Sequence, residues 1–184
     1  ATAMPAPTTD QPRYDVSGGV GATYVGNTDA YLEIWIGNGF PQQDRVRGDL
    51  FQGDRLVARY DAVNQHNEWE YHATALTPGS SVTFHLGLYL WDTNRDEWQW
   101  VATRSDTFIA GEIEGAIKHN TVWHGGAWSL KGPVWVQDGA RLTIDGGAVV
   151  TLAPDAWMVN DSTLVLDGAS AALEVENATL RDMV

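Results

Sequence analysis

Asp92, Asn94 and Asp96 alternate along a short polar turn, a spacing that resembles the first half of a calcium-binding loop. Carboxylate and amide oxygens are ligands that Ca²⁺ prefers, which makes the turn a candidate metal site. The glycine expected after the third ligand and the distant bidentate glutamate are both missing. Because Asp and Asn are also ordinary turn residues, we expect at most loose Ca²⁺ binding here and no other cofactor.

Four large aromatic side chains flank this turn within residues 89–101. If Trp91 faces Trp98 across a hairpin, Tyr89 faces Trp100. All four rings then share one face, together with His85. The opposite face carries an apolar stripe that predicts a core face: Val82, Phe84, Leu86, Leu88 and Leu90. A shift of one residue in register would instead turn Trp98 and Trp100 into the core, and the sequence leaves both registers open.

The aromatic face has two interpretations. Gln99 is a poor core residue, which favours the register that points the four rings outward. An outward patch of this size is typical of an interaction site and could stack against the sugar rings of a polysaccharide. It could equally pack against another part of the protein or a neighbouring subunit, because interfaces are enriched in Trp and Tyr.

Residues 66–72 offer a second set of potential metal ligands on alternate positions, namely His66, Glu68, Glu70 and His72. Strand residues two apart can share a Zn²⁺ ion. The four side chains would nevertheless spread over about 20 Å of an extended strand, too far for one ion. We therefore expect a polar stripe that faces solvent, with Trp69 buried behind it.

The composition excludes several classes of partner. The net charge of −13 would repel nucleic acids and acidic membrane surfaces, whereas cations and neutral polymers remain acceptable. There is no cysteine, so disulfides and thiolate metal sites cannot form. The sequence has no apolar run of about 18 residues, so we expect no membrane insertion. Residues 1–13 are rich in Pro, Thr and Ala, which predicts a linker or a processed N-terminus and an extracellular or cell-surface location.

Residues 14–111 predict seven strands separated by polar loops, the number expected of an immunoglobulin-like β-sandwich. The predicted strands are 14–25, 30–38, 45–53, 55–63, 68–76, 81–91 and 97–110. Leu76, Pro78 and Gly79 precede a long alternating strand and resemble the corner of fibronectin type III domains. The corner tyrosine of that family would fall near Val82, so the resemblance supports a sandwich rather than membership.

Residues 112–184 have a different pattern, which predicts short strands separated by Gly, Asp and Asn. LTIDG at 142–146 and LVLDG at 164–168 lie 22 residues apart, a period that indicates a solenoid such as a parallel β-helix. Asp145 and Asp167 would then stack about 4.8 Å apart. Paired carboxylates near this separation occur in retaining glycosidases, but both precede Gly, so we expect them to shape turns.

The same region resembles the opening rung of secreted bacterial right-handed β-helix proteins. The matching residues are Thr121, Trp123, Gly139, Ala140, Leu142, Thr143 and Ile144. The usual Pro-Gly that follows is replaced by Asp145-Gly146. The resemblance covers about 60 residues and implies an extracellular scaffold. A chain that stops after so few rungs would continue into further rungs or be covered by another subunit.

Together these features predict an all-β, exported protein: an immunoglobulin-like sandwich followed by the first rungs of a parallel β-helix. No Ser-His-Asp order, phosphate-binding loop or HExxH motif points to catalysis by this chain alone. We expect a scaffold or adhesion module that assembles, with itself or other surface subunits, through its open β-helix end and aromatic face. The alternative is a carbohydrate-binding module of a polysaccharide-active β-helix enzyme, with Tyr89, Trp91, Trp98 and Trp100 holding the glycan.

Overall fold

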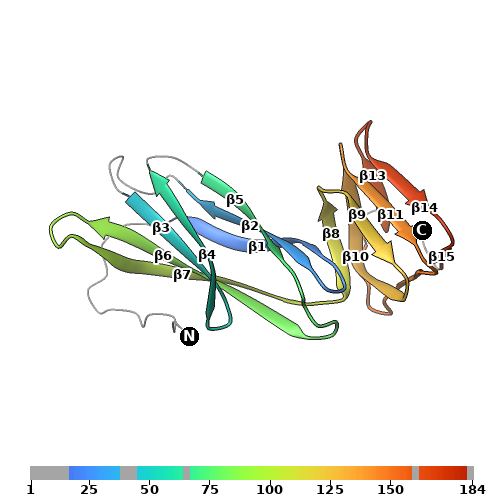
Figure 1. Ribbon diagram of the computed structural model, residues 1–184, viewed down its shortest axis with the longest axis horizontal. Helices are drawn as coiled ribbons and strands as arrows, with labels where there is room; N and C mark the ends of the chain where they lie inside the picture. Colours follow the sequence, from blue (N-terminus) through green and yellow to red (C-terminus); the bar gives the residue numbers. More distant parts are fainter. Residues whose placement is uncertain (1–16, 38–44, 64–66, 159–161, 182–184) are drawn as a thin grey trace. The chain divides into compact units, whose positions relative to one another are not determined.

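The computed structural model of the protein describes residues 17–37, 45–63, 67–158 and 162–181 (Figure 1). These residues form fifteen strands and no helix, so the all-β prediction is confirmed for the described part of the chain. The strands are β1 Gly18–Val25, β2 Ala30–Ile36, β3 Arg45–Gln52, β4 Arg55–Val63, β5 Asn67–Ala73, β6 Ser81–Asp92, β7 Glu97–Ile109, β8 Glu112–Ile117, β9 Thr121–His124, β10 Ala127–Gln137, β11 Arg141–Asp145, β12 Val149–Leu152, β13 Leu164–Asp167, β14 Ala172–Val175 and β15 Thr179–Leu180.

The chain divides into two compact units that interleave in sequence. Unit 1 comprises Ala1–Ala22, Leu32–His72 and Ser81–Phe108. Unit 2 comprises Thr23–Tyr31, Ala73–Ser80 and Ile109–Val184. It therefore includes the last residues of β1 and β5 and the first residues of β2. Each unit is described on its own below.

Unit 1 is a two-sheet sandwich built from β1–β7, one strand for each of the seven segments predicted to be strands. One sheet has the strand order β4-β3-β6-β7. In the other sheet, β1, β2 and β5 are adjacent, in the order β1-β2-β5. In the first sheet β3 pairs antiparallel with both β4 and β6. This non-sequential order, with β3 beside β6, is typical of immunoglobulin-like sandwiches.

The core of unit 1 lies between the two sheets. Alternate residues of β2 and β6 are fully buried there, as period-two patterning requires: Leu32, Ile34, Ile36, Phe84, Leu86 and Leu88. Gly48 of β3 marks the close approach, because a Cβ atom there would lie 3.1 Å from Leu86 and 3.3 Å from Ile36. Each buried Leu or Ile contributes about 1.5–3 kcal/mol, so this alternation is what holds the two sheets together.

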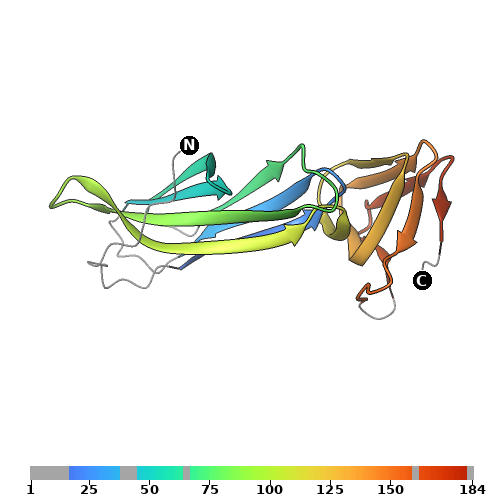
Figure 2. The ribbon, with the colours of Figure 1, turned by 90° about the horizontal axis from the view of Figure 1, so that it is seen from below.

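Strands β6 and β7 form a long hairpin that runs side by side in both views of Figures 1 and 2. Its core face is the predicted stripe, in which Leu86 and Leu88 are fully buried. The other face carries His85, whose Nδ1 lies 2.7 Å from Ser105 Oγ on β7, and Thr83, which contacts Thr107 at 2.9 Å. Tyr89 and Trp91 alternate with the core stripe along β6, as His85 does, and so lie on the face that points away from the core.

Unit 2 is built from parallel strands that stack on one another. After β8 pairs antiparallel with the end of β1, β10 pairs parallel with β8, β12 and β13, and β12 pairs parallel with β15. A second, three-stranded sheet has β11 between β9 and β14, again parallel. Buried side chains from both sheets form one core, with Trp123 at its centre and its indole N–H bonded to Tyr24 Oη at 2.9 Å.

The spacing between stacked strands is not constant, which overturns one prediction. Thr121 pairs with Leu142, 21 residues later, but Leu142 pairs with Leu173, 31 residues later. Asp145 therefore lies beside His124, while Asp167 lies beside Gln137 in the other sheet. The predicted stacking of Asp145 on Asp167 is wrong, because a longer segment between β12 and β13 changes the period.

Among the described residues, no helix is long and apolar enough to cross a membrane.

Candidate binding surfaces

Three of the predicted aromatic residues, Tyr89, Trp91 and Trp98, lie on the outer face of the sheet β4-β3-β6-β7, where arginines from β3 cover them. Trp91 and Trp98 contact each other edge to face, with ring centroids 5.2 Å apart, which matches the predicted facing pair. The Arg47 guanidinium lies 4.6 Å from the Tyr89 ring and 4.9 Å from the Trp98 ring. Because Arg47 pairs with Tyr89 across β3 and β6, Trp98 shares this face and is not part of the core.

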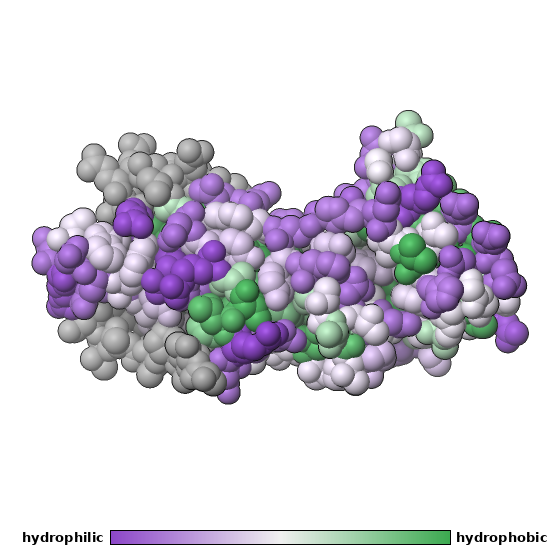
Figure 3. All heavy atoms as spheres, in the orientation of Figure 1, coloured by the Kyte–Doolittle hydropathy of each residue, from purple (hydrophilic) through white to green (hydrophobic). Residues whose placement is uncertain are grey.

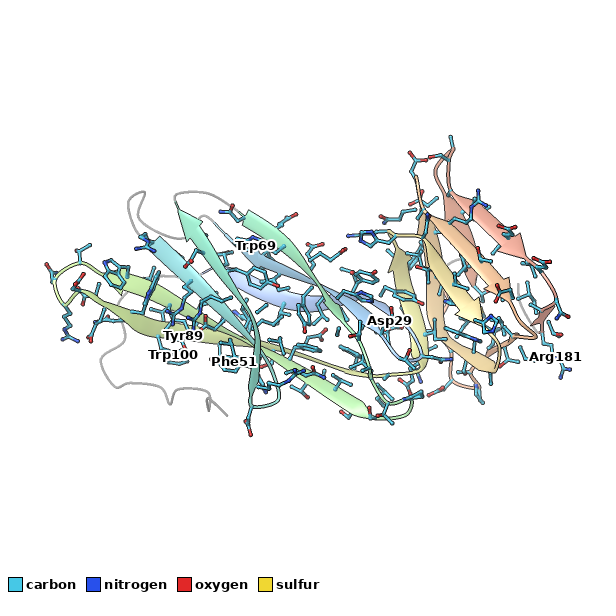
Figure 4. The ribbon with its side chains drawn as sticks, viewed as in Figure 1. Asp29, Phe51, Trp69, Tyr89, Trp100 and Arg181 are labelled. Atoms are coloured by element: carbon cyan, nitrogen blue, oxygen red, sulfur yellow. The ribbon has the colours of Figure 1, made fainter. Side chains whose placement is uncertain are left out.

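The face is less open than a free stacking platform would be. Tyr89 is only 8% exposed, and the three tryptophans are half-buried. Arg45 contributes two further cation–π contacts, 5.8 Å from the Trp91 ring and 5.4 Å from the Trp98 ring. Trp100, labelled with Tyr89 in Figure 4, donates from its Nε1 to Thr103 Oγ1 on the same strand at 3.1 Å. A ligand on these rings would have to replace contacts that the arginines already make.

Asp49 explains why arginines gather here. It is 3% exposed, and both its oxygens accept hydrogen bonds from Arg59, at 2.7 and 3.0 Å. Arg47 Nε lies 3.1 Å from the same carboxylate. The β3–β4 register places Asp49 directly opposite Arg59, so the ion pair follows from strand pairing. Burial raises the pKa of the Tyr89 phenol and Asp49 raises it further, whereas Arg47 and Arg59 lower it.

In the predicted calcium turn, both carboxylate oxygens of Asp92 accept hydrogen bonds from other groups of the protein. Asp92 Oδ1 accepts hydrogen bonds from the backbone N–H groups of Asn94 and Arg95, at 2.8 and 3.2 Å, and Oδ2 accepts one from Gln99 Nε2 at 2.7 Å. Asp96 adopts a left-handed conformation at φ 56°. These contacts are those of an ordinary Asx turn, and Ca²⁺ binding at this turn stays a prediction.

The other potential ligands are scattered. Within the described ranges no three His, Asp or Glu side chains are grouped to hold a metal ion. Glu68, Glu70 and His72 are exposed on β5 as predicted, whereas His66 lies outside the described residues. Trp69, which was predicted to be buried, is only half-buried and packs on Tyr60 with centroids 5.0 Å apart. In unit 2, His124 Nδ1 lies 2.5 Å from Asp145 Oδ1.

The last stacked strands of unit 2 expose side chains that the strands before them bury. Val136, which is fully buried, pairs with Leu166, which is 51% exposed. Val150 is likewise buried beneath the exposed Leu180. In the described residues β13, β14 and β15 are each paired on one side only. Such an edge presents unpaired backbone groups to another strand. On the face that Figure 3 shows, apolar side chains form separate patches in a mostly hydrophilic surface.

The sequence did not single out Trp157, an exposed indole in the long segment between β12 and β13. Its side chain is 48% exposed, and its Nε1 donates to Glu114 Oε2 on β8 at 2.7 Å. The sequence signal that could have found it is the break in spacing between the strands VVTL and LVLD, which marks an insertion in a repeat.

Comparison with known proteins adds no family. No protein-family model and no curated protein sequence matches the chain. Over 52% of its length the chain is similar to the sensor domain of the anti-sigma factor RsgI4 of Pseudobacteroides cellulosolvens, covering 95% of that chain at 8% identity and a TM-score of 0.34. Over 56% it is similar to the CARDB domain of the PF1109 protein of Pyrococcus furiosus in complex with di-metal ions, covering 94% of that chain at 11% identity and a TM-score of 0.36. Likeness at this level carries no argument about function.

Proposed function

We propose that the protein is a non-catalytic extracellular scaffold or adhesion module that self-associates through the exposed last strands of unit 2. In this proposal unit 2 is the beginning of a parallel β-helix, and each coil is buried by the next. The observation that carries it is the register itself, which places the half-exposed Leu166 directly over the buried Val136. A second copy that docks there would cover apolar side chains and pair the open strand edges in one step.

The extracellular location is part of the same proposal. Support comes from the composition, which is rich in Trp and Gly and strongly acidic, as suits an extracellular β-rich module. The alternative, a carbohydrate-binding module that uses the aromatic face of β6 and β7, finds no comparable support. Tyr89 is nearly buried, and the rings of Trp91 and Trp98 are already stacked by arginines.

Light scattering after size-exclusion chromatography tests self-association. We expect the wild-type chain to form dimers or larger assemblies as its concentration rises, and the substitution Leu166→Lys to return it to a monomer. The matched control is Val122→Lys, because Val122 is also exposed but lies on β9, the first of the stacked strands in its sheet. A wild-type chain that stays monomeric at every concentration, or a Leu166→Lys variant that still assembles, would contradict the proposal.

A further inference from the structure

An insertion separates β12 from β13 in unit 2, and its described residues on either side of 159–161 are fixed to β10. Leu130 and Val134 of β10 are separated by only three residues. Leu130 pairs with Leu152, the last residue of β12, whereas Val134 pairs with Leu164, the first residue of β13. Three backbone hydrogen bonds anchor the inserted segment on β10: Ala153 N to Leu130 O, Trp157 N to Lys131 O and Thr163 O to Val134 N, each 2.9 Å. Insertions in solenoid coils often form the binding face.

Trp157 is held in one orientation by this anchoring. Its ring rests on Gly132, where a Cβ atom would lie 2.6 Å from Trp157 Nε1 and Cε2 and 2.6 Å from Glu114 Oε2. Only glycine leaves room for the indole in this position. The indole N–H is bonded to Glu114, so the only polar atom of the ring is already satisfied. What Trp157 offers to a ligand is therefore the flat apolar surface of a fixed ring.

The groups around this ring are polar and mainly acidic. Lys131 Nζ is paired with the Asp155 carboxylate, and Glu112 and Glu114 are near enough to Lys131 to raise its pKa further. The hydrogen bond from Lys131 lowers the pKa of Asp155, so both members of that pair stay charged. Glu114 is thus bonded to the edge of the Trp157 ring, and Lys131, with Asp155 and Glu112 near it, is the chain neighbour of the Gly132 on which the ring rests. This setting excludes an apolar peptide, because docking it would strip water from several charged groups.

We propose that Trp157 is the platform of a glycan-binding site that takes a neutral or amine-bearing sugar ring. A sugar presents C–H groups from one face and hydroxyl groups from its rim, which complements an apolar ring bordered by hydrogen-bond acceptors. The carboxylates of Glu112, Glu114 and Asp155 accept hydrogen bonds from hydroxyl or ammonium groups and repel sugars that carry carboxylate or sulfate. The site is distinct from the aromatic face of unit 1 and does not depend on self-association.

A glycan array that carries neutral, amine-bearing and acidic oligosaccharides tests the proposal. The wild-type chain, Trp157→Ala and the matched control Val122→Ala are compared, with oligolysine as a purely cationic probe. We expect wild type to bind at least one neutral or amine-bearing glycan and Trp157→Ala to lose at least tenfold in affinity for it, measured by calorimetry. Val122→Ala, which removes an exposed apolar side chain elsewhere in unit 2, should bind as wild type does.

Gly132→Ala separates loss of the platform from loss of folding. This variant keeps the indole but displaces it from its seat, so we expect weakened glycan binding with an unchanged circular dichroism spectrum. The proposal is overturned if wild type binds no neutral or amine-bearing glycan, if Trp157→Ala and wild type bind equally, or if only acidic glycans or oligolysine distinguish them. Because self-association is measured separately with Leu166→Lys, failure of one proposal leaves the other intact.

Discussion

Asp49 is the side chain on which the outer face of unit 1 depends. A carboxylate with so little exposure is stable only when charged partners replace the water it has lost. Arg59 supplies two hydrogen bonds to it, and Arg47 approaches it while stacking on Tyr89. The aromatic and arginine residues of this face therefore form one connected layer, with Asp49 as its electrostatic centre.

Asp49→Asn should destabilise unit 1 by about 2 kcal/mol, because the arginines lose their charged acceptor. The expected cost is at the low end for a broken buried pair, since half of the Arg59 side chain is exposed and can recover water. Urea denaturation followed by circular dichroism measures the change. The control Asp54→Asn, in the exposed turn between β3 and β4, should stay within about 0.5 kcal/mol of wild type. Equal stabilities of the two variants would refute the central role of Asp49.

Tyrosines make folding sensitive to alkali. Burial raises the pKa of Tyr60 to about 12. Burial raises the pKa of Tyr24 as well, and the hydrogen bond from Trp123 offsets only part of that rise. The unfolded chain releases these protons near pH 10, so the folded state binds more protons above that pH. Their contribution to stability is complete below pH 10 and is lost as pH rises through the folded pKa values.

We therefore expect the melting temperature to fall steadily between pH 10 and 12, and to fall less in Tyr60→Phe than in wild type. Phenylalanine keeps the ring that packs on Trp69 but has no proton to lose. Differential scanning calorimetry across this range gives the slopes. Parallel slopes for wild type and Tyr60→Phe would show that Tyr60 does not contribute.

At the scale of strands, the sequence predicted those features that depend only on the pattern of residues within one strand. Local patterning predicted strands at both β2 and β6, and the alternation along β6 also predicted its core face, because one face of a sandwich sheet must be apolar. It failed for Asp145 and Asp167, since any strand that ends in an Asp-Gly turn has the same local signature, whatever strand it stacks on. Trp157 was missed for a related reason: Gly132 and Glu114, which position it, come from β10 and β8, strands remote from it in the sequence.

The junction of β1 with β8 in unit 2 gives a test at this scale. Gly115 has φ 105°, and a Cβ atom there would overlap the carbonyl oxygen of Thr23. Gly115→Ala should therefore cost about 3 kcal/mol or more, because both the conformation and the contact forbid a side chain. Gly21→Ala on β1 is the matched control, since no atom lies within 4 Å of its Cβ position and its φ is not positive. Thermal denaturation should separate the two variants clearly, and similar melting temperatures would mean that the β1–β8 pairing can shift.

For the whole molecule, charge is the dominant feature, with 24 acidic against 11 basic side chains. Like charges at this density repel one another and oppose the compact state, most strongly at low salt. Added NaCl shortens the Debye length from about 10 Å at 0.1 M to about 3 Å at 1 M and should raise the melting temperature. This effect is general, and it must be separated from a specific cation site.

CaCl₂ and MgCl₂ at equal concentrations make that separation. A Ca²⁺ ion held by Asp92, Asn94 and Asp96 would stabilise the folded chain beyond screening, in proportion to the logarithm of its concentration. Both oxygens of Asp92 already accept hydrogen bonds, one from the turn and one from Gln99 of β7, so we expect the two salts to raise the melting temperature equally. The substitution Asp92→Asn should leave this equality unchanged. A larger rise with Ca²⁺ in wild type that disappears in Asp92→Asn would instead establish the turn as a calcium site, because screening alone does not discriminate between two divalent ions.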